Sequence, residues 1–354
     1  MENRNGSYSQ FKVFHHHDRL DMLDAGERCA PIYIRIKPTN ACNHNCYYCT
    51  YAAGNSVNRG SVNRADSIPW PKLREIIRDM ADMGVKAVTF SGGGEPLTYS
   101  HIREAAEMVC EAGIDYSLIS NGQLLKGETA RAFVRAKWVR VSLDSSDGDL
   151  YCKMRGLKRG AFDDVCANLE EFSKIKAANC VLGINYVVGN ENYHLVYQAA
   201  KLVKELGADN IKFSALAGAE DDKRDSKAAI RAIQHAKEDF EDEHFKIVSN
   251  YEQELTEEFL SERQFDYCYT KELVTVIAAD QKVYLCHQRA YDPRAVLGDL
   301  KNASFKEVWF APETIVRAKA LRPRCDCKNP CVYEERNILL ENYFSKDRNH
   351  INFI

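Results

Sequence analysis

The chain lacks the features of several broad protein classes. No apolar run approaches the roughly 20 residues needed to cross a membrane, and residues 1–14 lack the apolar core of a signal peptide. The net charge of −3 gives no sign of the basic surface with which proteins bind nucleic acids. We therefore expect a cytoplasmic protein with neither a membrane nor a nucleic-acid partner.

What the chain has in excess is cysteine, with 13 in 354 residues. In a small secreted protein such a count indicates disulfides, but in a long chain without an export signal it indicates metal binding or catalysis. The cysteines fall into two tight groups and several singletons. The rest of the composition, 45% hydrophobic and 28% charged, is ordinary for a globular chain.

From residue 32 onward, short apolar runs alternate with helical patterns. The expected strands cover residues 32–37, 86–90, 116–120, 138–143, 181–188 and 211–214. The expected helices cover residues 71–83, 102–112, 128–136, 162–178 and 193–206. This alternation predicts an α/β fold with a parallel sheet and helices outside it. Six units are too few for an eight-stranded barrel, so we expect a partial (β/α)6 barrel.

The remaining segments give the expected domain organisation. Residues 1–31 form an N-terminal extension, and residues 32–215 the partial barrel. Residues 216–262 form a helical connection, with a charge-dense helix at 220–244. Residues 263–354 form a small α+β domain, with a hairpin at 273–286 around Asp280-Gln281 and helices at 305–310, 314–321 and 332–342.

The first cysteine group, Cys42, Cys46 and Cys49, comes directly after the first strand, where parallel α/β folds place their sites. A [4Fe-4S] cluster usually takes four thiolates, so three leave one iron with an open position. A structural zinc loop that uses His44 as the fourth ligand stays an alternative.

The C-x3-C-x2-C spacing, with Tyr48 before the third cysteine, resembles the signature of the radical S-adenosylmethionine (SAM) superfamily. The resemblance implies that the open iron binds the amino and carboxylate groups of SAM. Reductive cleavage then yields a 5′-deoxyadenosyl radical, which abstracts hydrogen from a substrate. It also implies a flavodoxin or ferredoxin as electron donor.

Further SAM contacts are expected at the ends of the next strands. Gly92, Gly93, Gly94 and Glu95 match the family's GGEP motif, which contacts the methionyl amine, although a plain tight turn looks similar. Asn121 at the end of the third strand, and Ser142 and Asp144 at the end of the fourth, resemble the family's positions that contact the ribose and carboxylate of SAM. Arg155 resembles an arginine that follows this strand in many relatives and pairs with the SAM carboxylate. Asn121 is also compatible with an Asn-Gly turn and Arg155 with a surface position.

The second group is Cys268, Cys286, Cys325, Cys327 and Cys331, five cysteines within 64 residues. Four of them suffice for zinc or for one [4Fe-4S] cluster. The region resembles the SPASM/twitch extension of radical SAM enzymes, and five cysteines instead of seven imply a twitch with one auxiliary [4Fe-4S] cluster. Gln281 stands where the family has glycine, and Cys325-Asp326-Cys327 replaces its C-x2-C. We expect Cys268, Cys286, Cys327 and Cys331 as ligands, with Cys325 as the rival of Cys327.

The sequence indicates the enzyme superfamily more clearly than the reaction that the enzyme catalyses. An auxiliary cluster can accept an electron from a substrate radical, so we expect oxidation of a small hydroxylated, sugar-derived molecule. A second hypothesis is crosslinking or epimerisation of a ribosomal peptide, which the 41 residues before Cys42 disfavour. A third is redox-neutral sugar epimerisation with Cys152 as the hydrogen donor. His287 and Arg289 are loose candidates to face the substrate, and a zinc-stabilised binding protein is the non-enzyme alternative.

Overall fold

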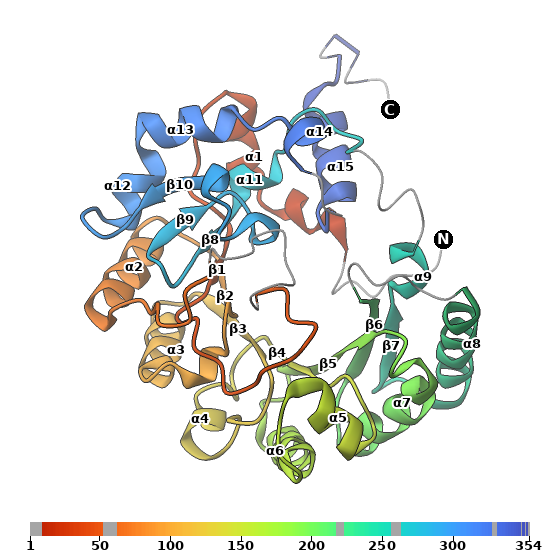
Figure 1. Ribbon diagram of the computed structural model, residues 1–354. Coiled ribbons are helices and arrows are strands. Elements are labelled where there is room, and N and C mark those ends of the chain that lie inside the picture. The colour runs from red at the N-terminus through yellow and green to blue at the C-terminus, as the bar shows by residue number, and fades with distance from the viewer. Residues whose placement is uncertain are drawn as a thin grey trace.

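A computed structural model describes residues 9–51, 62–216, 223–255, 263–327, 331–347, 349–350 and 352. Its strands form one ten-stranded sheet in the order β10-β9-β8-β1-β2-β3-β4-β5-β6-β7. Figure 1 shows this sheet as an open, curved surface with helices α2 to α8 in an arc outside it. The α/β fold with a partial parallel barrel is therefore confirmed.

The barrel strands run parallel, each paired with its neighbour in chain order. Their bounds are β1 Tyr33–Ile36, β2 Ala87–Phe90, β3 Asp115–Ser120, β4 Trp138–Ser142, β5 Val181–Val188, β6 Asn210–Ala215 and β7 Lys246–Ser249. The helices between them are α2 Trp70–Asp82, η3 Pro96–Thr98, α3 Ile102–Glu111, α4 Gly127–Arg131, α5 Gly148–Arg155, α6 Ala161–Ile175, η4 Tyr193–Leu195, α7 Val196–Glu205 and α8 Lys223–Phe240, with α9 Tyr251–Glu254 after β7. Because every strand points the same way, all their carboxyl ends meet at one edge.

The core lies between the sheet and the arc of helices. Along β1 the side chains alternate, and Ile34 and Ile36 are fully buried on the helix side. Helix α2 buries an apolar stripe at helical spacing against the sheet, formed by Leu73, Ile76, Ile77 and Met80. Burial on this one side leaves the other face of the sheet for polar side chains inside the barrel.

Strand β7 and helix α5 of the barrel were not expected. The connection over residues 216–262 is not only helical, because it contains β7, a four-residue strand too short for a clear alternating pattern. Helix α5 was also missed, although its end signals are present in the sequence. The Asp147 side chain accepts a hydrogen bond from the Leu150 backbone, and Gly156 ends the helix in the left-handed conformation.

The C-terminal part extends the same sheet. Strand β8 (Val274–Ile277) pairs parallel with β1, and β9 (Lys282–Tyr284) and β10 (Val296–Asp299) follow antiparallel. The remaining helices are η2 Gln10–His15 and α1 His17–Asp24 near the N-terminus, and α11 Thr270–Leu273, η5 His287–Arg289, η6 Pro293–Ala295, α12 Phe305–Phe310, α13 Pro312–Lys319, α14 Pro323–Asp326 and α15 Glu334–Phe344. The expected hairpin is confirmed, and the expected boundary at residue 263 does not interrupt the sheet.

The turn between β8 and β9 keeps a left-handed residue without glycine. Gln281, which stands where the resembled family has glycine, has a φ of 62°. Its backbone nitrogen donates to the Ala278 carbonyl, and its own carbonyl accepts from Leu300. These bonds hold a conformation that a side chain with a Cβ atom rarely adopts.

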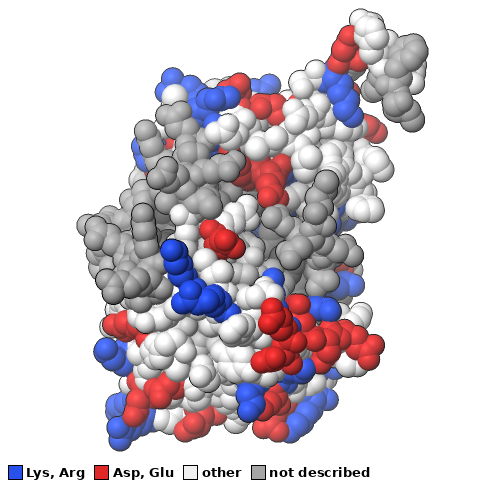
Figure 2. Space-filling model, turned by 90° about the vertical axis from the view of Figure 1, so that its right-hand side faces the viewer, with Lys and Arg blue, Asp and Glu red and all other residues white. Residues whose placement is uncertain are grey.

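No helix among the described residues is long and apolar enough to cross a membrane. On the face shown in Figure 2, acidic side chains gather in the lower part beside a smaller group of basic ones. The described residues of that face form no broad basic surface.

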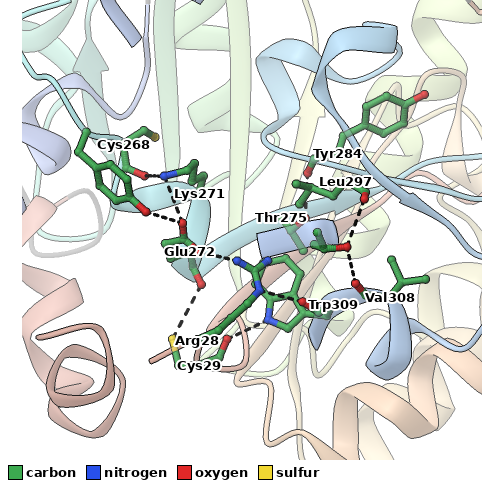
Figure 3. Close-up of polar contacts among 12 residues, drawn as sticks. Arg28, Cys29, Cys268, Lys271, Glu272, Thr275, Tyr284, Leu297, Val308 and Trp309 are labelled. Carbon is green, nitrogen blue, oxygen red and sulfur yellow. Dashed lines mark hydrogen bonds and ion pairs between the residues drawn. The ribbon is translucent and has the colours of Figure 1, made fainter. Parts of the chain in front are cut away.

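A buried charge cluster joins the C-terminal part to the N-terminal segment (Figure 3). Arg28 forms an ion pair with Glu272 at 2.5 Å, and its guanidinium lies 3.9 Å from the centre of the Trp309 ring. Lys271 approaches the other oxygen of Glu272 at 3.1 Å and donates to the Cys268 carbonyl at 3.2 Å. The cluster therefore fixes the backbone of Cys268 relative to the start of the chain.

We expect Glu272→Gln to lower the free energy of unfolding by about 3 kcal/mol, because it leaves two buried cations without their carboxylate. Urea unfolding followed by circular dichroism measures the change. The matched control is Glu170→Gln, whose surface pair with Lys174 should contribute less than about 1 kcal/mol. Equal effects of the two substitutions would contradict the prediction.

Candidate functional site

The first three cysteines lie on a loop that follows the carboxyl end of β1. Cys42, Cys46 and Cys49 are half-buried, and none forms a disulfide. Burial raises the pKa of Cys42 to about 11 and raises that of Cys46 as well. The thiols of Cys42 and Cys46 are therefore protonated in the metal-free protein, and metal binding must displace their protons.

The glycine turn after β2 packs directly on the start of this loop. The Gly94 nitrogen donates to the Thr39 carbonyl at 3.3 Å, and the Glu95 nitrogen donates to Ala41 at 2.8 Å. A Cβ atom on Gly94 would lie 2.1 Å from the Ala41 carbonyl oxygen. Only glycine permits this approach, so the turn holds the backbone just before Cys42.

Glu95 joins the turn to the end of β3. Its carboxylate is buried and accepts hydrogen bonds from the Leu97 nitrogen, the Ser120 hydroxyl and the Asn121 nitrogen at 2.7 to 3.0 Å. Burial raises the pKa of Glu95, and the backbone hydrogen bonds from Asn121 and Leu97 oppose that rise. The carboxylate thus positions two strand ends, and its contact with SAM stays a prediction.

Side chains after β3 hold the cysteine loop from a second direction. Asn121 donates to the Asn43 side chain at 2.8 Å. Gln123 accepts from Asn43 at 2.8 Å and lies 3.0 Å from Nε2 of His44. Sequence reasoning missed Gln123, although it directly follows the Asn121-Gly122 pair at a strand end.

His44 shapes the loop and is not free to bind zinc. Its Nε2 faces Gln123, and its Nδ1 lies 3.4 Å from a guanidinium nitrogen of Arg155. Burial, assisted by the charge of Arg155, lowers the pKa of His44 to about 4. Because both nitrogens of the neutral imidazole already contact other side chains, His44 is not available as the fourth ligand of a structural zinc site.

The third support is a buried ion pair between Asp144, after β4, and Arg155, in α5. Asp144 also accepts from the Tyr48 hydroxyl and from the Val187 nitrogen, so it connects the loop to β5. Arg155 also donates to the Ser142 carbonyl at 2.9 Å. Burial disfavours the charge of Arg155, but Asp144 outweighs this and holds the pKa of Arg155 well above its usual value.

Backbone contacts add to this support. The carbonyls of Met154 and Arg155, at the end of α5, accept from the nitrogens of Tyr47 and Asn45 at 3.2 and 2.9 Å. The expected SAM-contacting side chains Tyr48, Asn121, Asp144 and Arg155 therefore all hold the cysteine loop. Their contacts with SAM itself stay predictions, as does that of Ser142.

Two further candidates lie away from this loop. Cys152 is buried in the main core, and its thiol donates to the Lys158 carbonyl at 3.1 Å. His287 lies 3.4 Å from the Tyr333 hydroxyl, and burial lowers its pKa well below the usual value. The hydrogen-bond partners of both side chains thus lie outside the loop of Cys42, Cys46 and Cys49.

Cys286 lies within electrostatic reach of three other C-terminal cysteines, Cys268, Cys327 and Cys331. Burial raises the pKa of Cys268 to about 12, and the neighbouring thiols Cys286 and Cys331 add to the rise. Burial likewise raises the pKa of Cys286 to about 11, with a contribution from Cys327. The polypeptide thus gathers Cys268, Cys286, Cys327 and Cys331 from three separate segments.

Cys325 and Cys327 differ in their surroundings. Cys325 is exposed on α14, whereas Cys327 is half-buried beside Arg289 and Arg263. Arg289 is held by an ion pair with Asp292 at 2.9 Å and donates to the Cys327 thiol. Arg289 therefore faces this cysteine group, so the loose expectation that it faces the substrate gains no support.

Among the described residues, no three His, Cys, Asp or Glu side chains converge as ligands of a single metal ion. The cysteines of both groups are free thiols, as the ligands of a [4Fe-4S] cluster must be.

The sequence matches the Radical SAM superfamily over residues 36–203. An AdoMet-dependent heme synthase of Methanosarcina barkeri is 32% identical over 51% of this chain and 49% of its own length. A GTP 3′,8-cyclase of Pelotomaculum thermopropionicum is 33% identical over 39% of this chain and 42% of its own. The chain thus spans about half or less of the length of these curated relatives.

A similar fold occurs in the crystal structure of Streptococcus suis SuiB bound to precursor peptide SuiA. The TM-score is 0.63 at 16% identity, over 87% of this chain and 72% of SuiB. At this identity the likeness concerns the fold alone, and it extends beyond the barrel to most of the chain.

Gly156 has a left-handed φ of 61°, and a Cβ atom there would lie 3.0 Å from the Asn45 carbonyl oxygen. We expect Gly156→Ala to lower the free energy of unfolding by about 1–2 kcal/mol for the backbone and by about 1 kcal/mol more for the contact. It should also weaken retention of iron by the loop. Chemical unfolding and iron analysis measure the two effects.

The control is Gly127→Ala, because Gly127 has a φ of 54° and a Cβ atom added there would meet nothing within 4 Å. It should show the backbone cost without the loss of iron. If both variants retain iron equally, the contact of Gly156 with Asn45 does not position the loop.

Proposed function

The chain belongs to the radical SAM superfamily, and we propose that it oxidises a small hydroxylated molecule, such as a sugar derivative, to the carbonyl compound. The family's cofactors are SAM and a [4Fe-4S] cluster. When bound, they would supply a 5′-deoxyadenosyl radical that removes a hydrogen atom from the carbon of the CH–OH group. Loss of the hydroxyl proton and of one electron then gives C=O, and an auxiliary cluster would accept that electron.

Cys42, Cys46 and Cys49 would hold the first cluster and leave one iron for SAM. The chain's own contribution is to fix this loop at the barrel edge from three sides. The glycine turn supports its start, Gln123 its middle, and Arg155 with Asp144 its end. A loop fixed before the cofactor binds loses less freedom on binding.

The gathering of Cys268, Cys286, Cys327 and Cys331 is the observation that carries the proposed oxidation. Four thiols fill the coordination of one [4Fe-4S] cluster, so such a cluster has no open iron and serves electron transfer. Strand β8, which precedes Cys286 in the hairpin, pairs directly with β1, which precedes Cys42. A flavodoxin or ferredoxin is proposed as the external electron donor.

The names of the relatives support a small-molecule substrate, since one is a heme synthase and the other a GTP cyclase. The second candidate is modification of a ribosomal peptide. The fold shared with SuiB, whose structure contains a precursor peptide, favours it. The expected cytoplasmic location and the expected domain boundaries stay predictions.

The triple variant Cys42→Ala, Cys46→Ala and Cys49→Ala should abolish release of 5′-deoxyadenosine from SAM. Anaerobic incubation with dithionite and chromatography of the nucleoside measure it. The variant should still bind about four irons in place of about eight. Cys110→Ala removes a half-buried cysteine from α3 and serves as the control, with unchanged release. Equal release by both proteins would refute the assignment of the loop.

Cys327→Ser should lower the iron content from about eight to about four per chain while leaving reductive SAM cleavage in place, because only the auxiliary cluster loses a ligand. Cys325→Ser is the matched control and should retain the full iron content, since Cys325 is exposed. The reverse pattern would assign the ligand to Cys325.

Cys152→Ala separates oxidation from epimerisation. The Cys152 thiol donates a hydrogen bond to the Lys158 carbonyl in the core, so we do not expect it to donate a hydrogen atom to the substrate. The variant should therefore form product at the wild-type rate once a substrate is found. Mass spectrometry should show a product two mass units lighter than the substrate. A product of unchanged mass that disappears in the variant would indicate an epimerase instead.

A further inference from the structure

A cavity of about 820 Å³ lies inside the barrel at the amino ends of the strands, away from the cysteine loop at their carboxyl ends. The first residues of the strands line it, including Ala87, Asp115 and Trp138. The N-terminal helix η2 and the C-terminal helix α15 also contribute to its lining. This volume is in the range of pockets that hold a small molecule.

The lining carries a surplus of positive charge. Its cationic side chains are Lys12, Arg35, Lys137, Arg140, Lys246 and Arg336, and its acidic ones are Asp115 and Asp209. Both acids are already neutralised, Asp115 by Lys137 at 3.3 Å and Asp209 by Lys176 at 3.0 Å. Among the described residues that line the cavity, neither acid is therefore left to balance the charges of Arg35 and Arg336.

Arg35 and Arg336 show this most clearly. Arg35 donates to the Tyr33 hydroxyl at 3.1 Å, and Arg336 lies 5.2 Å from the centre of the Tyr333 ring. Within the part of the chain that the structure describes, neither pairs with a carboxylate. The Nε atom of Arg336 is buried and has no hydrogen-bond acceptor there. Burial lowers the pKa of Arg336, and burial together with Arg336 lowers that of Lys12.

Buried arginines elsewhere in this protein have a carboxylate partner. Arg28 pairs with Glu272, Arg155 with Asp144, Arg263 with Glu334 and Arg289 with Asp292. Arg35 and Arg336 are half-buried. A cation that is partly removed from water without a partner is costly, and proteins retain such groups where a ligand supplies the opposite charge. The difference between these paired arginines and the two in the cavity indicates that a bound ligand supplies the negative charge there.

We propose that this cavity is an anion-binding site, separate from the SAM site, for a small molecule that carries a phosphate or several carboxylates. The planar guanidinium of arginine donates two parallel hydrogen bonds to either group. The site stands on the cavity and its charges, so it does not depend on the proposed oxidation.

Isothermal titration calorimetry of the full-length protein with inorganic pyrophosphate and, separately, with citrate tests the site. In 150 mM salt we expect saturable 1:1 binding of at least one of them with a Kd below about 1 mM. Arg336→Gln and Arg35→Gln should each weaken it about tenfold or more, as expected for loss of a charged contact. Tighter pyrophosphate binding assigns the site to phosphates, and tighter citrate binding assigns it to polycarboxylates.

The matched control is Arg103→Gln, which removes an exposed arginine from α3 and should leave binding unchanged. Saturable binding of neither anion, or equal weakening by Arg103→Gln, would overturn the proposal.

Thermal unfolding distinguishes a binding role from a structural one. Without anion, Arg336→Gln should melt at the wild-type temperature or above, because it removes the repulsion between Arg336 and Lys12. Whichever of pyrophosphate and citrate binds more tightly should raise the melting temperature of the wild type and of Arg336→Lys but not that of Arg336→Gln. A variant that melts far below the wild type without anion would show that Arg336 is needed for the fold, against the proposal.

Discussion

The buried pair of Asp144 and Arg155 is the interaction on which the geometry of the site depends. It joins the end of β4 to the end of α5, and both partners reach the cysteine loop, through Tyr48 and through His44. Removing either partner would leave an uncompensated charge in the interior. The pair therefore holds the loop in one arrangement, with its thiols at the barrel edge, before a cofactor is present.

Charge organises the rest of the molecule by the same principle. The cluster of Arg28, Lys271 and Glu272 fixes the segment of Cys268 against the N-terminal region, and Arg289 is held by Asp292 beside Cys327. Both cysteine groups are thus positioned by buried ion pairs. Arg35 and Arg336, in the cavity at the other end of the barrel, differ because they contact tyrosines and, within the described residues, no carboxylate, which is why we interpret that cavity as a binding site.

Sequence reasoning identified most strands and helices because each has a long enough apolar period, as in α2 and β5. It missed β7 and α5, since four residues of strand and a helix with a mixed pattern carry little periodic signal. It recognised the residues around the loop, such as Asp144 and Arg155, but as ligand contacts. Their mutual pairing depends on strand ends far apart in the chain, and no local pattern records it.

The sequence by itself determined the superfamily and its cofactors, because the spacing of Cys42, Cys46 and Cys49 and the glycines after β2 are local features that one loop or turn must satisfy. Tertiary structure decided which distant groups meet. It left Cys325 exposed and Cys327 half-buried, brought both nitrogens of His44 into contact with other side chains, and gave Arg336 no carboxylate partner among the described residues. Burial and pairing arise only when the sheet brings separate segments together, so they cannot be read from residue types alone.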